Sequence, residues 1–280
     1  MTVRLVVNAD DFGMSDPISR GIVRAHREGI VTSTSLLGNC DDLRGAKALL
    51  DDAPTLGVGL HLTLVGGRPV SDPSTVPSLV EPDGGFPRGW PGVVAAWAKG
   101  RLRGDEVERE LDAQISRARD AGLTLDHLDT HQHVGFLPLV GRAVEAVARR
   151  HGIAGIRAST DRPSVTWMGE PLRAAEAAVL LGLGWLTRRQ MGSLRYGPAT
   201  WGFVESGRLD EIRILEILGR LGPGDHELLC HPGESDAPLP DRDPTWRYQW
   251  TGELQALTSA TIRAAITRRG ITLCRWADLF

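Results

Sequence analysis

The sequence predicts an α/β fold, a TIM-like (β/α) barrel, regular or distorted, with seven or eight strands. Short β-branched runs alternate with helical patterns along the 280 residues, which indicates parallel strands joined by helical crossovers. No internal repeat or low-complexity segment interrupts this alternation. Polar residues gather where the predicted strands end, as they do around the cavity of a parallel barrel.

The first predicted strand is the apolar run 5–8, and a helix follows it to about residue 28. Ser15 and Asp16 precede Pro17, which is a typical helix start. The later strands are short apolar or β-branched runs, at 32–37, 57–62, 125–130, 155–157, 227–230 and 272–274. The later helices have apolar residues at helical spacing, at 105–121, 139–150, 209–221 and 252–269.

We expect residues 1–280 to form a single catalytic domain with three loop insertions, near 66–92, 161–200 and 232–248. Long structured loops on one rim usually form a binding face. The second insertion contains the apolar segment 174–186. A helix that is apolar on nearly all faces is either buried or meets an apolar partner. This segment is therefore either a core helix or a cover over the cavity that contacts a hydrophobic part of the ligand.

Composition and charge exclude several classes of partner. The chain is 41% hydrophobic and 24% charged, with a net charge of -3 and both signs spread along it. We expect no nucleic-acid partner and no polybasic anchor, and the longest apolar stretch is too short for a membrane span. Three cysteines without CxxC spacing, and no signal-peptide pattern, predict a cytoplasmic protein with reduced thiols. The oligomeric state stays open, with a homodimer as one option.

Residues that carry chemistry follow the predicted strands. Asp10 and Asp11 follow the first strand, Asn39 follows the second, and His61 lies in the third. The remaining ones are at later strand ends: Asp126, His127, Asp129, His131, His133, Arg157 and His231. Because the carboxyl ends of the strands in a parallel barrel face one cavity, we expect these side chains in one pocket.

Asp10 and Asp11 are adjacent, and adjacent strand residues point to opposite faces. They are therefore not expected to lie side by side as a carboxylate dyad. One could bind a metal while the other reaches a reacting water from a different angle. The alternative is that they cap the next helix, although Ser15 and Asp16 already suit that task.

His61 interrupts an apolar strand, where a lone histidine is more often a core residue than a ligand. A second group of histidines changes this balance. His131 and His133 are two residues apart and would project to the same side if the strand continued. Two imidazoles and one carboxylate form a competent catalytic metal site. We take Asp11, His61 and His131 as the ligands of one divalent metal ion.

The other polar residues receive weaker assignments. His231 precedes Pro-Gly and is interpreted as a catalytic acid, with a structural tie of the loop as the alternative. A buried arginine needs a partner, so Arg157 is expected to hold a carboxylate in the pocket. His127, Asp129 and His133 each either orient a ligand histidine or are structural. The substrate-binding candidates are Asn39, Arg157 and His133.

Four motifs stand in order along the chain: NADDFG at 8–13 with GIVTSTS at 29–35, GLHL at 59–62, DHLDTHQHV at 126–134, and LCHPG at 229–233. This set resembles the YdjC-like carbohydrate deacetylases, a family that includes chitooligosaccharide deacetylases and the deacetylase of hopanoid biosynthesis. The resemblance extends over nearly the whole chain. The opening hexapeptide is highly specific, and the ordered set is more so.

The resemblance implies a polysaccharide-deacetylase-like catalytic domain on a (β/α) barrel, and it implies the same three metal ligands. It also implies that Asp10 is the general base. The family is associated with magnesium, whereas a site with two imidazoles suits zinc, so the choice between Zn²⁺ and Mg²⁺ stays open. Gln132 and Gly135 stand where the family usually has histidine.

We therefore expect a metal-dependent carbohydrate N-deacetylase, which removes the N-acetyl group from an N-acetylated amino sugar of an oligosaccharide or glycoconjugate and releases acetate. Asp10 would take a proton from water, and His231 would protonate the departing amine. A non-heme iron oxygenase, which shares the ligand set, is one alternative. It would require a 2-oxo acid. The other is a non-catalytic sugar-binding protein on the same fold, which would lose nothing on Asp10→Asn.

Overall fold

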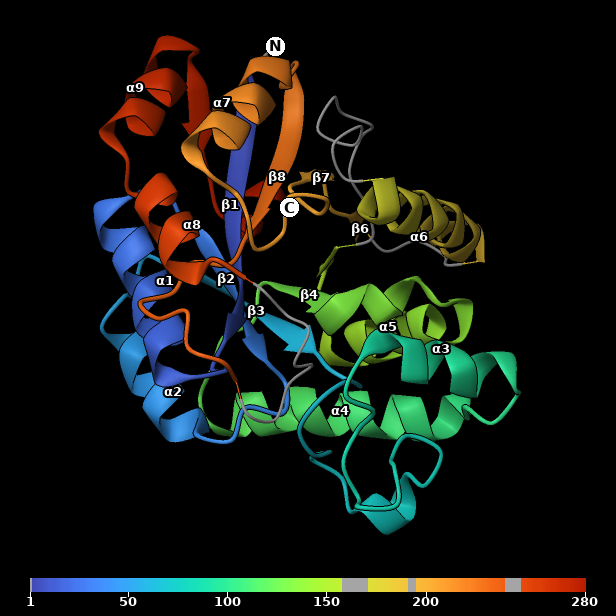
Figure 1. Cartoon of the computed structure of the whole chain (residues 1–280). Helices are drawn as coiled ribbons and strands as arrows, with labels where there is room; N and C mark the ends of the chain where they lie inside the picture. The colour runs from blue at the N-terminus through green and yellow to red at the C-terminus, as the bar shows by residue number, and fades with distance from the viewer. Residues whose placement is uncertain (1, 158–170, 191–194, 240–247) are drawn as a thin grey trace.

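All strand pairs of the computed structural model are parallel, and they build one curled sheet (Figure 1). The structure describes residues 2–157, 171–190, 195–239 and 248–280. Its strands are β1 (Val3–Phe12), β2 (Ser33–Leu37), β3 (Gly57–Leu62), β4 (His127–Thr130), β5 (Gly155–Ile156), β6 (Arg195–Tyr196), β7 (Ala199–Trp201), β8 (Gly224–Cys230) and β9 (Ile271–Leu273). The order across the sheet is β6-β5-β4-β3-β2-β1-β8-β7, and β9 pairs with the start of β1.

The two ends of the sheet are close together in the sequence. β6 pairs with β5, β7 pairs with β8, and only Gly197 and Pro198 separate β6 from β7. A sheet whose end strands are two residues apart has to curl back on itself, so the carboxyl ends of its strands turn toward a common centre. The parallel α/β class is confirmed. In the described part of the chain the strand pairs form an open path, so a complete TIM barrel is not confirmed.

Helices connect the strands and lie around the outside of the sheet, with α4 packed beside α5 and α7 beside α9 (Figure 1). They are α1 (Asp16–Glu28), α2 (Leu43–Asp51), α3 (Trp90–Ala98), α4 (Gly104–Asp120), α5 (Pro138–His151), α6 (Pro171–Gln190), α7 (Glu211–Arg220), α8 (Trp250–Leu257) and α9 (Ala260–Arg268). None of these described helices combines the length and the apolar character needed to cross a bilayer.

The middle of the core is β1, because it is flanked by β2 on one side and by β8 on the other. Its residues Leu5 and Val7 are completely buried. The helix α1 covers it with a periodic apolar face that includes Ile18 and Ile22. Full burial of each such side chain contributes about 1.5–3 kcal/mol to the free energy of unfolding. This packing fixes the strand that carries Asp10 and Asp11.

Several predicted boundaries were wrong. β1 continues to Phe12 instead of ending at residue 8, and α2, α3, β6 and β7 were not predicted. The single helix predicted at 252–269 is two helices, α8 and α9. The first helix ends at Leu257, with Thr258 as its C-cap. Ser259 caps the second, because its side chain accepts a hydrogen bond from the backbone N–H of Thr261.

The insertion at 66–92 is a fixed rim rather than a loose loop. Both carboxylate oxygens of Glu110 on α4 accept backbone N–H groups, from Val70 and Ser71, at 2.9 Å each. Glu106, one helical turn earlier, accepts the N–H of Ser78 at 2.7 Å. Two buried carboxylates of α4 therefore hold this segment against the helix. The other two predicted insertions lie partly outside the described residues.

Candidate active site

Asp10 and Asp11 face the same centre, contrary to the prediction from strand alternation. The pairing of β1 with β2 shifts register between Ala9 and Phe12, and Asp11 has a φ of 69°. This is a β-bulge, in which the extra residue re-aims a side chain. As a result both carboxylates approach His61, with Oδ2 of Asp10 at 3.8 Å and Oδ1 of Asp11 at 3.5 Å from its Nε2.

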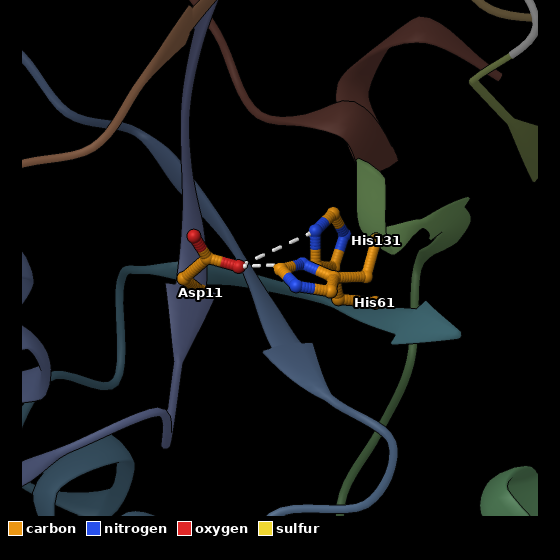
Figure 2. Close-up of side chains that lie close together, drawn as sticks. All are labelled: Asp11, His61 and His131. Atoms are coloured by element: carbon orange, nitrogen blue, oxygen red, sulfur yellow. Dashed lines mark ion pairs between the residues drawn. The ribbon is translucent and has the colours of Figure 1, made fainter. Parts of the chain in front are cut away.

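Asp11, His61 and His131 form a buried cluster (Figure 2). Oδ1 of Asp11 lies 3.0 Å from Nδ1 of His131, and the two imidazole rings meet edge to face with centroids 5.2 Å apart. One potential ligand atom from each residue lies within 4.8 Å of the others. Figure 2 shows the carboxylate of Asp11 directed at both rings. The structure thus brings together the three residues predicted as metal ligands.

Asp129 orients His61. The two residues are paired neighbours on β3 and β4, and Oδ1 of Asp129 lies 2.7 Å from Nδ1 of His61. With Nδ1 engaged in this way, Nε2 of His61 is the nitrogen that faces Asp11. A carboxylate behind a histidine is the usual way to fix the tautomer of a metal ligand.

Arg157 is the central cation of the site. All five of its N–H groups face carboxylates: Nη1 and Nη2 contact Asp10 at 2.7 and 2.9 Å, Nε and Nη2 contact Glu227 at 2.9 and 2.7 Å, and Nη1 contacts Asp129 at 2.7 Å. Arg157 was predicted to hold a carboxylate, and it holds three: those of Asp10, Asp129 and Glu227. Sequence reasoning missed Glu227, although an ionisable residue in a buried apolar strand was an available signal.

The pKa values reflect this crowding of charge. Burial alone would raise the pKa of Asp10, but Arg157 and then His61 hold it well below its usual range. Burial also opposes ionisation of Asp11, yet His131 and His61 lower the pKa of Asp11 to about 2. Burial would lower the pKa of His61, but Asp129 and then Asp10 raise it to about 9. The carboxylates are ionised and the centre favours positive charge.

The donor set fits a divalent metal ion. Oδ1 of Asp11 is buried and receives no well-directed hydrogen bond from the described residues, as expected for an atom that serves a cation. One carboxylate and two imidazoles suit zinc or a similar ion, whereas magnesium prefers oxygen ligands. Such an ion would also offset the excess negative charge of the site. The guanidinium of Arg157 is surrounded by three carboxylates, and Asp11 adds a fourth beside them: Asp10, Asp129 and Glu227 are the three.

His231 lies next to Asp10 across the sheet, because Ala9 and Cys230 are paired neighbours on β1 and β8. Its backbone N–H donates to Oε2 of Glu253 at 2.6 Å. Its Nδ1 is buried and has no hydrogen-bond partner among the described residues. Burial lowers the pKa of His231. In the free protein the ring is therefore neutral at neutral pH and has an unused nitrogen at the site.

Asn39 and His133 lie at the edge of the site. The side-chain amide of Asn39 donates to the carbonyl groups of Gly66 and Arg68, at 2.9 and 3.1 Å, so it ties down the start of the rim. β4 ends at Thr130, and His133 has a φ of 54°. The predicted common face of His131 and His133 on a continued strand is therefore wrong. Burial, and to a smaller extent the positive charge of Arg157, lowers the pKa of His133 to about 3.

Two departures from the family pattern have local explanations. Gln132 has a φ of 51°, and its Oε1 accepts the backbone N–H of Trp90 at 2.7 Å, which connects the turn at His131–Phe136 to α3. A Cβ atom at Gly135 would lie 2.8 Å from Cγ2 of Thr130. A histidine at this position would therefore require Thr130 to move.

The helix α6 is not a core helix. Leu172, Val179 and Trp185 are 82%, 62% and 54% exposed. The opposite side of the helix faces the site, since Gly184 and Thr187 line a pocket together with Asp129, His133 and Arg157. The hydroxyl of Thr187 donates to the backbone carbonyl of Phe136 at 2.7 Å. α6 thus covers a pocket at the site with one side and presents apolar side chains to the surface with the other.

Comparisons with known proteins identify the family of the chain. The model of the YdjC-like protein family matches residues 4–268. The chain is 34% identical to the carbohydrate deacetylase of Geobacillus stearothermophilus, over 98% of this chain and 97% of that protein. It is also 34% identical to the chitooligosaccharide deacetylase of Salmonella paratyphi B, over 95% of each.

A solved structure shares the fold. A crystal structure of a protein from Enterococcus faecalis V583 superimposes with a TM-score of 0.79 at 26% identity, and the match covers 100% of this chain and 99% of that one. The family match and the full-length relatives therefore lead to the same conclusion: the chain belongs to the YdjC-like family.

Proposed function

We propose that this chain is a metal-dependent carbohydrate N-deacetylase, which hydrolyses the N-acetyl group of an N-acetylated amino sugar. The observation that carries the proposal is the buried cluster of Asp11, His61 and His131 with Asp10 beside it. Full-length relatives named carbohydrate deacetylase and chitooligosaccharide deacetylase support the substrate class.

In this proposal Asp11, His61 and His131 hold one divalent ion. Bound there, such an ion would lower the pKa of water and polarise the acetamide carbonyl. Zinc fits the donor set better than magnesium on grounds of ligand softness.

The residues of the chain then move two protons. Asp10 is ionised and takes the proton of the attacking water as the new C–O bond forms. His231, on the neighbouring strand, delivers a proton to the amine as the C–N bond breaks. Acetate and the free amino sugar leave. Because His231 starts neutral, we infer that the proton taken up by Asp10 reaches it during turnover.

Arg157 acts through Asp10 in this mechanism. It holds both carboxylate oxygens at 2.7 and 2.9 Å, which fixes the direction of the base. It also keeps the pKa of Asp10 low, so Asp10 is a weak base. A weak base requires a water of lowered pKa, which is the chemistry that a bound divalent ion supplies. We assign Arg157 to positioning rather than to direct substrate contact, because its five N–H groups are engaged.

Further features of the proposal concern substrate and context. Asn39 and His133 remain our candidates for sugar contacts, and the region 1–280 is proposed to act as one catalytic domain. The three cysteines are buried free thiols, as predicted. The cytoplasmic location and a homodimer stay predictions.

Release of acetate tests the proposed activity. Purified protein is incubated with free, oligomeric and lipid-linked N-acetylated sugars, and acetate is quantified. We expect release that chelation abolishes and a divalent ion restores. His61→Ala and His131→Ala should lose bound metal, while His26→Ala, a half-buried histidine outside the site, should retain it.

Two outcomes would contradict the proposal. Full activity after exhaustive chelation, with the absence of metal confirmed by elemental analysis, would exclude the metal mechanism. Sugar binding without acetate release, unaffected by Asp10→Asn, would favour a sugar-binding protein instead.

A further inference from the structure

A continuous chain of polar contacts runs from the amino end of β4 to His61, behind the candidate active site. Nδ1 of His127 lies 2.5 Å from Oδ1 of Asp126, and its Nε2 lies 3.1 Å from Oγ of Ser35. Oγ of Ser35 lies 2.7 Å from Oδ2 of Asp129, whose Oδ1 contacts His61. We call these five residues the buried chain. The mechanism above uses only its last two members.

The ring of His127 is held in one position. It is completely buried, and it stacks on Trp276 with centroids 4.6 Å apart and planes 9° apart. It also lies against Gly59, where a Cβ atom would fall 2.3 Å from Cε1 of the ring. Any side chain at Gly59 would therefore displace His127. Asp126, at the other end of the buried chain, is 14% exposed.

The hydroxyl of Ser35 has three polar neighbours, and their chemistry fixes its direction. The amide of Asn8 donates both to Oδ1 of Asp10 at 2.8 Å and to Ser35 at 2.9 Å. Because an ionised carboxylate only accepts, the NH₂ group of Asn8 must face Asp10, and so it donates to Ser35 as well. Ser35 is thus an acceptor from Asn8, which leaves its single proton for one of its two other neighbours.

That proton goes to Asp129. Oδ2 of Asp129 also faces Nη1 of Arg157 at 2.7 Å, so it is an ionised oxygen that accepts. A serine hydroxyl has one proton to donate. Since Ser35 gives it to Asp129, Nε2 of His127 cannot accept from Ser35 and has to donate to it. Nε2 of His127 therefore carries a proton.

The other ring nitrogen of His127, Nδ1, also carries a proton, because it faces a carboxylate oxygen of Asp126. We propose that His127 is a buried imidazolium, paired with Asp126, which sets the direction of the buried chain and so positions His61. The order of donation is then fixed from His127 through Ser35 to Asp129. Asp129 then has its Oδ1 available for Nδ1–H of His61. Nε2 of His61, which faces Asp11, is therefore the nitrogen that gives up its proton when a metal ion binds.

The positioning role of His127 rests on the proposed function only in that Nε2 of His61 faces the metal. The first test does not depend on enzymatic activity. Nitrogen-15 NMR of the metal-free protein, labelled at histidine, reads the protonation of each ring nitrogen. The His127 signals are identified by their loss in His127→Gln or, if that variant does not fold, by their shift in Ser35→Ala. We expect both ring nitrogens of His127 to carry a proton at pH 7. One unprotonated nitrogen at pH 7 would overturn the proposal and leave the deacetylase assignment intact.

The second test asks whether the buried chain positions His61. Ser35→Ala should weaken zinc binding by roughly 10–100-fold, the usual cost of losing a group that orients a ligand. Thr34→Val is the matched control, because it also removes a buried hydroxyl from β2. The hydroxyl of Thr34 donates to the backbone carbonyl of Ala9 and is not part of the buried chain. This control variant should bind zinc as the unmodified protein does. Equal affinities in the two variants would contradict the proposal.

Asp126→Asn extends the same test to the far end. Asp126 does not contact His61, so a merely local role would leave zinc affinity unchanged, and that result would contradict the positioning role. We expect weaker zinc binding in the same direction as for Ser35→Ala, measured by competition with a chromophoric chelator. Deacetylase activity is measured separately, so loss of activity alone does not decide the result.

Discussion

Arg157→Lys should destabilise the protein far more than the same substitution at an exposed arginine. Arg157 makes five N–H contacts to carboxylates and its side chain is 2% exposed. A lysine ammonium has three N–H groups, so at least two contacts are lost. Each buried hydrogen bond between charged groups is worth about 1.5–3 kcal/mol, which predicts a loss of about 3–6 kcal/mol in the free energy of unfolding.

Urea denaturation with a constant m-value measures this loss, and Tm should fall by at least roughly 6 °C for a protein of this size. Arg150→Lys is the control. Arg150 also contacts two carboxylates, Asp112 and Glu108, but its side chain is 51% exposed, so the change should stay within about 1 kcal/mol. Equal losses in the two variants would refute the reasoning that burial and the five contacts make Arg157 irreplaceable.

Three further predictions concern the site. Asp10→Asn should keep bound metal while kcat falls by roughly 10²–10⁴, whereas Asp11→Asn should lose metal affinity; the reverse pattern in elemental analysis would invert their roles. Because the pKa of His61 is raised to about 9, a metal ion has to displace its proton below that pH, so apparent zinc affinity by chelator competition should rise about tenfold per pH unit from 6 to 8. A pH-independent affinity would contradict this. Trp185 lies on the surface side of α6, so only an aglycone long enough to leave the pocket over this helix can contact it. Trp185→Ser should therefore raise KM for a lipid-linked N-acetylglucosaminide but not for the free sugar, whereas substitution of the exposed Ile212 on α7 by serine should change neither. Equal effects of Trp185→Ser on both substrates would exclude an aglycone contact.

The regular parts of the fold could be predicted because burial leaves a periodic pattern. β3 was placed correctly at 57–62, and the start of α1 follows from Pro17. The strands β6 and β7 have two and three residues, too few to show any period. The break between α8 and α9 had a signal in Ser259, but the apolar spacing on both sides concealed it.

The candidate site was predictable in its residue types and not in its geometry. Strand ends gather in a parallel sheet, so Asp11, His61 and His131 could be selected from position and chemistry. The bulge at Asp11 could not be predicted, because alternation assumes a regular strand and a φ of 69° is a property of the folded backbone. Glu227 was missed because the significance of its charge depends on Arg157, which lies 70 positions away in the sequence.

The central place of β1 has a consequence for how the chain folds. β1 leaves the ribosome well before its partner β8, because Val3 pairs with Gly224 and Ala9 pairs with Cys230. Until those residues are made, one edge of an apolar strand has no partner and can pair with another chain. Such distant pairing also slows folding. We therefore expect the yield of refolding to depend strongly on protein concentration, and fragments that end before residue 224 to aggregate, even where the complete chain is stable at equilibrium.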